Sequence, residues 1–117
     1  MENKYKLKNI EMSKILKLED EISYQKGQIV SKTLVQNKHV SLTLFAFDKG
    51  EEISTHSSEG DAMVTVLDGK GRFTVGDEVF IVSKGETLIM PNQVPHAVYG
   101  EEQFKMLLTV VFKHSLI

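Results

Sequence analysis

The stretch GEEISTHSSEGDAMVTVLDG, Gly50–Gly69, decides the fold of this chain. It leads through a polar turn into AMVTVL, a strand-like segment in which apolar residues occur at both odd and even positions. Because alternate residues of a strand share a face, Ala62 and Val64 would point to one side and Met63 and Leu67 to the other. The stretch therefore predicts a β-strand pair joined by a polar turn, with apolar side chains on both faces of the second strand.

The rest of the chain after Gly27 has the same character. Short segments rich in β-branched and aromatic residues alternate with turn residues, which is typical of a sandwich or barrel. Asp68-Gly69 and Gly76-Asp77 each lie between two such segments and are expected to be hairpin tips. We expect residues 1–26 to form an extended arm or short helix and residues 27–117 to form an all-β barrel domain. The predicted strand segments are QIVSKTLV, HVSLTLFAF, AMVTVL, RFTV, VFIV, TLIMP and FKMLLTVVF.

Composition narrows the functional classes. The 117 residues suffice for one hydrophobic core, and 41% hydrophobic residues, 26% charged residues and a net charge of −2 are ordinary for a globular protein. The chain has no excess of basic residues that would favour nucleic-acid binding, and no apolar run approaches the ~20 residues of a membrane span. The chain has no cysteine, so disulfides, thiolate metal sites and a cysteine nucleophile are excluded. We expect a cytoplasmic protein that binds neither nucleic acid nor membrane.

One segment of the opening stretch resembles a known motif. Gly50-x5-His56-x-Ser58-x3-Ala62-x6-Gly69 is similar to the first motif of the cupin superfamily, G-x5-H-x-H-x(3,4)-E-x6-G. The two glycines and the first histidine are in register. Ser58 stands at the second histidine position and Ala62 at the glutamate position.

A second segment strengthens the resemblance. Gly85-x5-Pro91-x-Gln93-x2-His96-x3-Gly100 is similar to the second cupin motif, G-x5-P-x-G-x2-H-x3-N. Its first glycine, its proline and its histidine match, whereas Gln93 replaces a glycine and Gly100 replaces the asparagine.

The resemblance extends over about residues 28–112 and has consequences for fold and site. It implies a small single-domain cupin, which is a jelly-roll β-barrel, commonly dimeric, with a cavity where three histidines and a glutamate bind a divalent metal. Only His56 and His96 remain of those four ligands. The metal, if one binds, would be Fe, Mn, Zn or Ni held weakly by these two imidazoles.

Two carboxylates could complete such a metal site. Glu59 and Asp61 are near His56 in the sequence, but neither is in phase with position 62, and Asp61 would face away from it unless a bulge re-aims its side chain. We expect residues 57–61 to be a polar turn instead. His39 and His114 are expected to be surface histidines.

The sequence leaves three functional hypotheses, and it does not decide whether the protein is an enzyme. The first is a small-molecule-binding protein whose pocket is centred on His56 and His96, because two imidazoles in an apolar cavity could bind an anionic or a hydroxylated ligand and act as acid and base. The second is a metal-dependent oxygenase, isomerase or lyase with a reduced ligand set. The third is an interaction module with a filled interior. The predicted pocket residues are Phe45, Phe47, His56, Ser58, Ala62, Met90, His96 and Tyr99.

The strand FKMLLTVVF suggests association with a second copy. Phe104 and Met106 would fill one face, while Leu107 and Val111 leave the other largely apolar, so both faces need cover. We expect a homodimer through a sheet face. The alternatives are that the N-terminal arm covers this surface, or that single apolar residues are simply exposed.

Overall fold

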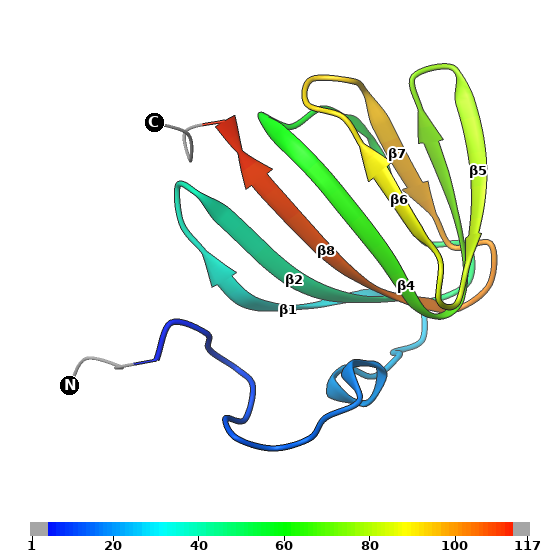
Figure 1. The fold of residues 1–117 in the computed structure, drawn as a ribbon. Helices are drawn as coiled ribbons and strands as arrows, with labels where there is room; N and C mark the ends of the chain where they lie inside the picture. The colour runs from blue at the N-terminus through cyan, green and yellow to red at the C-terminus, as the bar shows by residue number, and fades with distance from the viewer. Residues whose placement is uncertain (1–4, 114–117) are drawn as a thin grey trace.

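The computed structural model describes residues 5–113. Within that range an N-terminal arm with one short 3-10 helix, η1, precedes eight antiparallel β-strands (Figure 1). This confirms the predicted all-β jelly-roll barrel. No helix in the described range is long and apolar enough to cross a membrane. The elements are η1 (Leu18–Glu21), β1 (Ile29–Gln36), β2 (Val40–Phe47), β3 (Glu52–His56), β4 (Gly60–Val75), β5 (Glu78–Ser83), β6 (Thr87–Met90), β7 (His96–Tyr99) and β8 (Phe104–Phe112).

The long strand β4 belongs to both walls of the barrel. Its first half, residues 60–69, pairs with β8 and β6, and its second half, residues 70–75, pairs with β5 and β7. The first wall consists of β1, β2, β8, the first half of β4 and β6. The second wall consists of β3, β7, the second half of β4 and β5. The two walls curl around a shared interior, as Figure 1 shows.

The structure corrects one predicted turn. Gly76-Asp77 is a hairpin tip, since Val75 pairs with Glu78 across it, but Asp68-Gly69 lies inside β4. A bulge between Val66 and Asp68 and the positive φ of Gly69, 72°, change the strand's course instead of reversing it. Asp-Gly supplies a positive φ, which serves a bulge as well as a turn, so the dipeptide alone could not distinguish the two.

Gly69 also permits a close backbone approach. A Cβ atom at this position would lie 1.9 Å from the carbonyl oxygen of Gln103, which directly precedes β8. No other residue type fits between these two backbones. The chain can therefore pass from the first wall to the second while it stays paired with β8 through Phe104.

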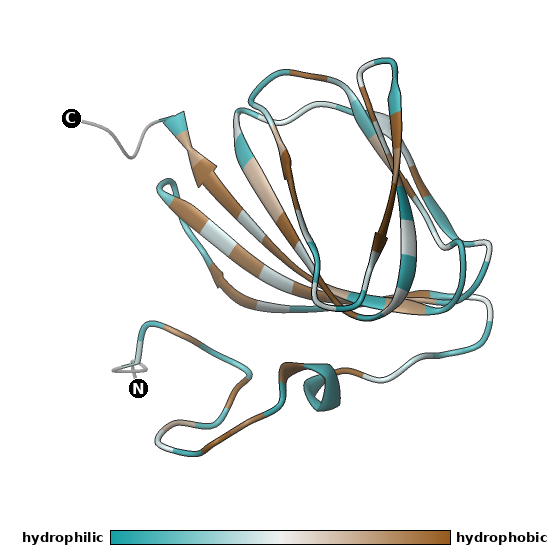
Figure 2. Ribbon diagram, turned by 45° about the vertical axis from the view of Figure 1, so that its right-hand side comes forward, coloured by the Kyte–Doolittle hydropathy of each residue, from teal (hydrophilic) through white to brown (hydrophobic). Residues whose placement is uncertain are grey.

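Aromatic side chains fill the barrel interior. The rings of Phe47 and Phe104 stack with centroids 4.6 Å apart, and Phe73 meets Phe104 edge-on at 5.9 Å. All three are fully buried. They come from β2, β8 and β4, so they join the two walls through one cluster. The strands alternate in hydropathy around this interior (Figure 2).

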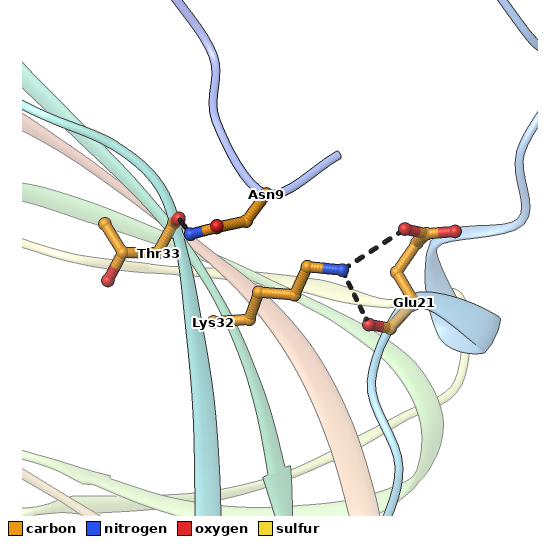
Figure 3. Close-up of polar contacts among 4 residues, drawn as sticks. All are labelled: Asn9, Glu21, Lys32 and Thr33. Atoms are coloured by element: carbon orange, nitrogen blue, oxygen red, sulfur yellow. Dashed lines mark hydrogen bonds and ion pairs between the residues drawn. The ribbon is translucent and has the colours of Figure 1, made fainter. Parts of the chain in front are cut away.

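The N-terminal arm covers part of the outer face of the first wall. Glu21 accepts hydrogen bonds from Lys32 Nζ at its backbone oxygen (3.1 Å) and at Oε1 (3.3 Å), and Asn9 Nδ2 donates to the carbonyl of Thr33 at 2.8 Å (Figure 3). Beneath these contacts, apolar residues of the arm meet those of the strands. This second cluster contains Ile10, Leu18, Ile22, Tyr24, Val30, Leu34, Leu42, Leu44, Ala46, Leu67 and Leu107.

The arm leaves another part of that outer face open. Met63 points outward, in agreement with the alternation of AMVTVL, and is 43% exposed. Leu67, in the same phase, lies under the arm. The predicted need for cover on this face is thus met at Leu67, in the middle of β4, and unmet at Met63, near its start.

Two glycines with similar φ angles provide a test of the β4 crossing. Gly69→Ala should lower the free energy of unfolding by at least about 3 kcal/mol, because it combines a left-handed residue with a backbone clash. Gly27 has φ 70° and nothing within 4 Å of an added Cβ. Gly27→Ala should therefore cost only about 1–2 kcal/mol. Urea unfolding of both variants measures the difference, and equal losses would contradict the close approach.

Candidate functional site

Strand pairing brings His56 and His96 together. His56 ends β3, His96 begins β7, and the two are direct partners in the β3–β7 ladder. Their ring centroids are 4.3 Å apart, with an interplanar angle of 65°. The structure therefore places side by side the two histidines that are 40 positions apart in the sequence.

The loop before β7 fixes the position of His96. Gln93 has φ 64°, a left-handed conformation that the glycine of the cupin motif adopts without strain. Its backbone NH donates to the carbonyl of Ser58 at 3.0 Å, which ties this loop to the segment after His56. The carbonyl of Pro95 accepts a hydrogen bond from the NH of Gly76 at 2.8 Å. The segments that follow β3 and β4, the two strands paired with β7, thus hold the loop before His96 in place.

Backbone carbonyls orient both imidazole rings. His56 Nδ1 lies 3.0 Å from the carbonyl oxygen of Ser54, and His96 Nδ1 lies 3.2 Å from that of Val94. A carbonyl oxygen only accepts, so each Nδ1 carries the hydrogen. In the neutral rings each Nε2 then carries a free lone pair. The geometry thus assigns each ring the tautomer in which Nε2 is a hydrogen-bond acceptor.

The two rings differ in exposure. His96 is buried, with 5% of its surface exposed, whereas His56 is exposed to solvent. Burial lowers the pKa of His96 below its ordinary value of 6.5, the carbonyl of Val94 raises it by a smaller amount, and the charge of His56 lowers it. His96 is therefore neutral at physiological pH, with its Nε2 available as an acceptor.

The residues at the other motif positions supply no metal ligand. The hydroxyl of Ser58 donates to the carbonyl of Gly60 at 3.1 Å, and Ala62 has no ligand atom. Asp61 is exposed and accepts a hydrogen bond from the backbone NH of Asn92 at 2.8 Å. Asp61 thus faces outward, as the strand phase indicates.

Glu59 is also engaged elsewhere. It forms an ion pair with Lys113 at 3.1 Å. Among residues 5–113 no group of three His, Cys, Asp or Glu side chains could hold a metal ion. Two imidazoles without a carboxylate are a poor donor set for Fe, Mn, Zn or Ni. The residues present therefore do not fit a tightly held metal.

Four of the predicted pocket residues lie in the hydrophobic core. Ala62 and Met90 are direct partners across β4 and β6, and both are 2% exposed. Phe47 is fully buried, and Phe45 packs against the same cluster. Their position beside a bound ligand stays a prediction.

Tyr99 and His39 lie apart from the histidine pair. Tyr99 is at the far end of β7 from His96, where the guanidinium carbon of Arg72 lies 4.5 Å from its ring centroid. His39 is exposed in the β1–β2 turn, and its backbone NH donates to Asn37 Oδ1. His114 lies outside the described residues.

Sequence reasoning missed the carbonyls of Ser54 and Val94. Each belongs to the residue two positions before its histidine, and no side-chain pattern marks such a contact.

Sequence reasoning also missed an open cleft of about 520 Å³ at the other end of the barrel, where Tyr24 donates a hydrogen bond to Asp68 at 2.5 Å. The cleft is lined by Tyr24, Asp48, Lys49, Asp68, Gly69, Glu102 and Gln103.

Comparison with known proteins defines the class of the chain. Residues 43–112 match the model of the cupin domain family, and the chain therefore belongs to this family. Cupins often bind metals. No protein of curated function shows significant sequence similarity to the chain.

Several solved structures resemble it closely. A conserved protein of unknown function from Streptococcus pyogenes is 45% identical, with a TM-score of 0.90 over 92% of this chain and 95% of that one. A cupin superfamily protein from Desulfitobacterium hafniense is 29% identical, with a TM-score of 0.88 over 93% and 100%. A cupin 2 conserved barrel domain protein from Leptotrichia buccalis is 48% identical, with a TM-score of 0.79 over 80% and 46%. These neighbours confirm a small single-domain cupin and assign no ligand.

The lowered pKa of His96 predicts a pH-dependent stability. As the pH falls below about 6.5, histidine in the unfolded chain binds a proton while folded His96 stays neutral. The unfolded state then binds more protons, so the free energy of unfolding decreases with falling pH. His96→Phe should make this decrease shallower, whereas the exposed control His39→Gln should leave it unchanged. Urea titrations across this pH range measure it, and an unchanged slope in His96→Phe would refute the burial argument.

Proposed function

We propose that this cupin binds a small molecule at the barrel end where His56 and His96 meet. The observation that carries the proposal is the orientation of both rings by backbone carbonyls, which leaves Nε2 of each ring free to accept, in two imidazoles whose centroids lie 4.3 Å apart. Side chains held by other contacts bind without further loss of rotamer freedom. Exposure of His56 gives a ligand access from solvent.

The chemistry of the pair selects the kind of ligand. A neutral imidazole with a free Nε2 accepts hydrogen bonds, so the pair suits hydroxyl or amino groups, and neutral His96 disfavours an anion. Burial of His96 strengthens this preference, because it opposes the charged form that an anion would require. A sugar, polyol or amino alcohol presents two such donors on one small molecule. The same Nε2 atoms could take a proton from a bound hydroxyl.

A metal-dependent enzyme is the second candidate. Histidines that ligate metals usually donate their other ring NH to a carbonyl or carboxylate, and both rings here do so. The missing carboxylate argues against it, because a site of two imidazoles needs ligands from solvent or substrate. A transition metal would then be held weakly.

Ligand binding can be tested by NMR with histidine labelled at ring carbon Cε1. Glycerol, ribose and ethanolamine at millimolar concentration should shift the Cε1–H signals of His56 and His96, with phosphate and citrate as the anionic comparison. His56→Ala and His96→Ala should each weaken binding by at least about tenfold, the loss of one good hydrogen-bond pair. His39→Ala is the matched control. Shifts by the anions alone, or binding unaffected in both variants, would count against the site.

Metal content separates the two candidates. Protein purified without chelator and without a nickel column should contain Fe, Mn, Zn and Ni well below one equivalent, because the motif positions supply two imidazoles and no carboxylate. Elemental analysis of the wild type and His56→Ala measures this. Stoichiometric metal in the wild type that is lost in the variant would make the metal-dependent enzyme the better account.

A further inference from the structure

The strand β5 forms an edge of the second wall, and within residues 5–113 it pairs with β4 and with no other strand. Its six residues keep a regular register with β4 and show no bulge. Figure 1 shows β5 as the outermost strand of this wall. Its apolar side chains Val79 and Ile81 are 60% and 49% exposed. An edge of this kind is a template for pairing with a further strand.

The other sheet edges are interrupted, covered or short. β1 has a bulge between Thr33 and Val35, and the carbonyl oxygen of Leu34 accepts a hydrogen bond from the backbone NH of Lys8 in the arm. The register of β3 shifts before His56, and β6 has only four residues. Bulges, covering segments and short strands are the usual means by which proteins protect sheet edges. Within the described range, β5 has none of these three.

The backbone groups of Val79 and Ile81 point away from β4. The NH of Lys84, which follows β5, donates to a carbonyl of β4 at 3.2 Å, whereas the NH of Ser83 donates to Glu86 Oε1 at 2.8 Å. Successive residues of an antiparallel strand direct their NH and carbonyl groups to opposite sides. The groups of Val79 and Ile81 are in phase with those of Ser83, so two NH and two carbonyl groups are exposed along the free edge.

A second copy of β5 satisfies all of these groups at once. When two such strands run antiparallel with Val79 of each opposite Ile81 of the other, both residue pairs are of the type that exchanges two hydrogen bonds. The twofold axis then passes beside Phe80, and four hydrogen bonds form between the copies. A register shifted by two residues would require the NH of Ser83, which Glu86 already occupies.

The two ends of β5 carry opposite charges that match in this register. Asp77 and Glu78 stand at its start, are exposed, and have no ion-pair partner among residues 5–113. Lys84 is exposed directly after its end. Glu78 would lie opposite Val82 of the other copy, which makes Lys84 of that copy its diagonal neighbour on the same face. The acidic end of each strand therefore meets the basic end of the other.

We propose that two copies of this chain join their second walls edge to edge through β5, so that the sheet of β3, β7, β4 and β5 continues into the second copy. The twofold arrangement closes this edge in both copies and leaves no strand there for further pairing. The contact involves neither the first wall nor His56 and His96. It is therefore separate from the predicted homodimer through a sheet face and independent of what binds at the histidine pair.

Disulfide formation tests the register, since the chain has no cysteine of its own. Val79→Cys and Ile81→Cys, with tags of different mass, should be mixed and oxidised. Opposite residues of a hydrogen-bonded antiparallel pair lie about 5.5 Å apart at Cα, which suits a disulfide. The mixed disulfide should form at least about tenfold more readily than a disulfide within either variant by itself, whose cysteines would be diagonal neighbours more than about 7 Å apart.

Ile89→Cys is the matched control, because Ile89 is 53% exposed on β6, in the first wall. Val79→Cys mixed with Ile89→Cys should give no more mixed disulfide than random collision produces. Failure of Val79→Cys and Ile81→Cys to combine, or equal yields in the two mixtures, would overturn the proposal.

Hydrogen exchange of single amides tests the same contact in the unmodified protein. The amides of Val79 and Ile81 should exchange at least about tenfold more slowly at millimolar than at low micromolar protein concentration, because pairing between copies removes them from water. The amide of Phe80 points to β4 and should exchange slowly at both concentrations. Ile81→Pro removes an NH from the free edge and none from the β4 ladder, so it should abolish the protection of Val79 in a protein that circular dichroism shows to be folded.

Exchange rates of Val79 and Ile81 that do not change with concentration would contradict the proposal. Fast exchange throughout would mean that the edge stays free. Slow exchange throughout would mean that another segment of the same chain covers it.

Discussion

The contact of Gly69 with the carbonyl of Gln103 is the constraint on which the rest of the structure depends. It lets β4 leave the first wall and continue into the second while it remains one strand. β7 pairs with the second half of β4, and β3 pairs with β7. The position of β4 therefore determines where β7 pairs, and the position of β7 determines where β3 pairs, so that His96 lies opposite His56. A chain that turned back at Gly69 would have no second wall in this position.

The histidine pair illustrates how a family site changes when its ligand set is reduced. Ser58 and Ala62 at two ligand positions remove the donors that a firmly bound metal needs. The surrounding backbone still orients His56 and His96, because that orientation comes from carbonyls and strand register instead of from the missing side chains. What remains is a pair of fixed acceptors, which suits hydrogen-bond recognition of a ligand that itself supplies the donors.

The sequence predicted the β-barrel architecture and the importance of the two histidines because both depend on patterns within short segments of the chain. Alternation in AMVTVL and the motif spacing around His56 and His96 depend on residue type and distance along the chain, both of which can be read directly. Asp68-Gly69 was misassigned because a positive φ serves a bulge and a turn equally. The tautomers could not be predicted, since they depend on carbonyl directions that only the folded loop before β7 and the end of β3 determine. The placement of the arm depends on tertiary contacts, so the sequence does not determine it for the same reason.

The most direct test of this account is the protonation state of the two ring nitrogens. Long-range proton–nitrogen NMR correlation of the labelled protein slightly above neutral pH distinguishes Nδ1 from Nε2 in each ring. We predict that Nδ1 carries the hydrogen in the neutral form of both His56 and His96, and that Nε2 carries a free lone pair. A hydrogen on Nε2 of either ring would remove one acceptor and contradict the proposed mode of recognition.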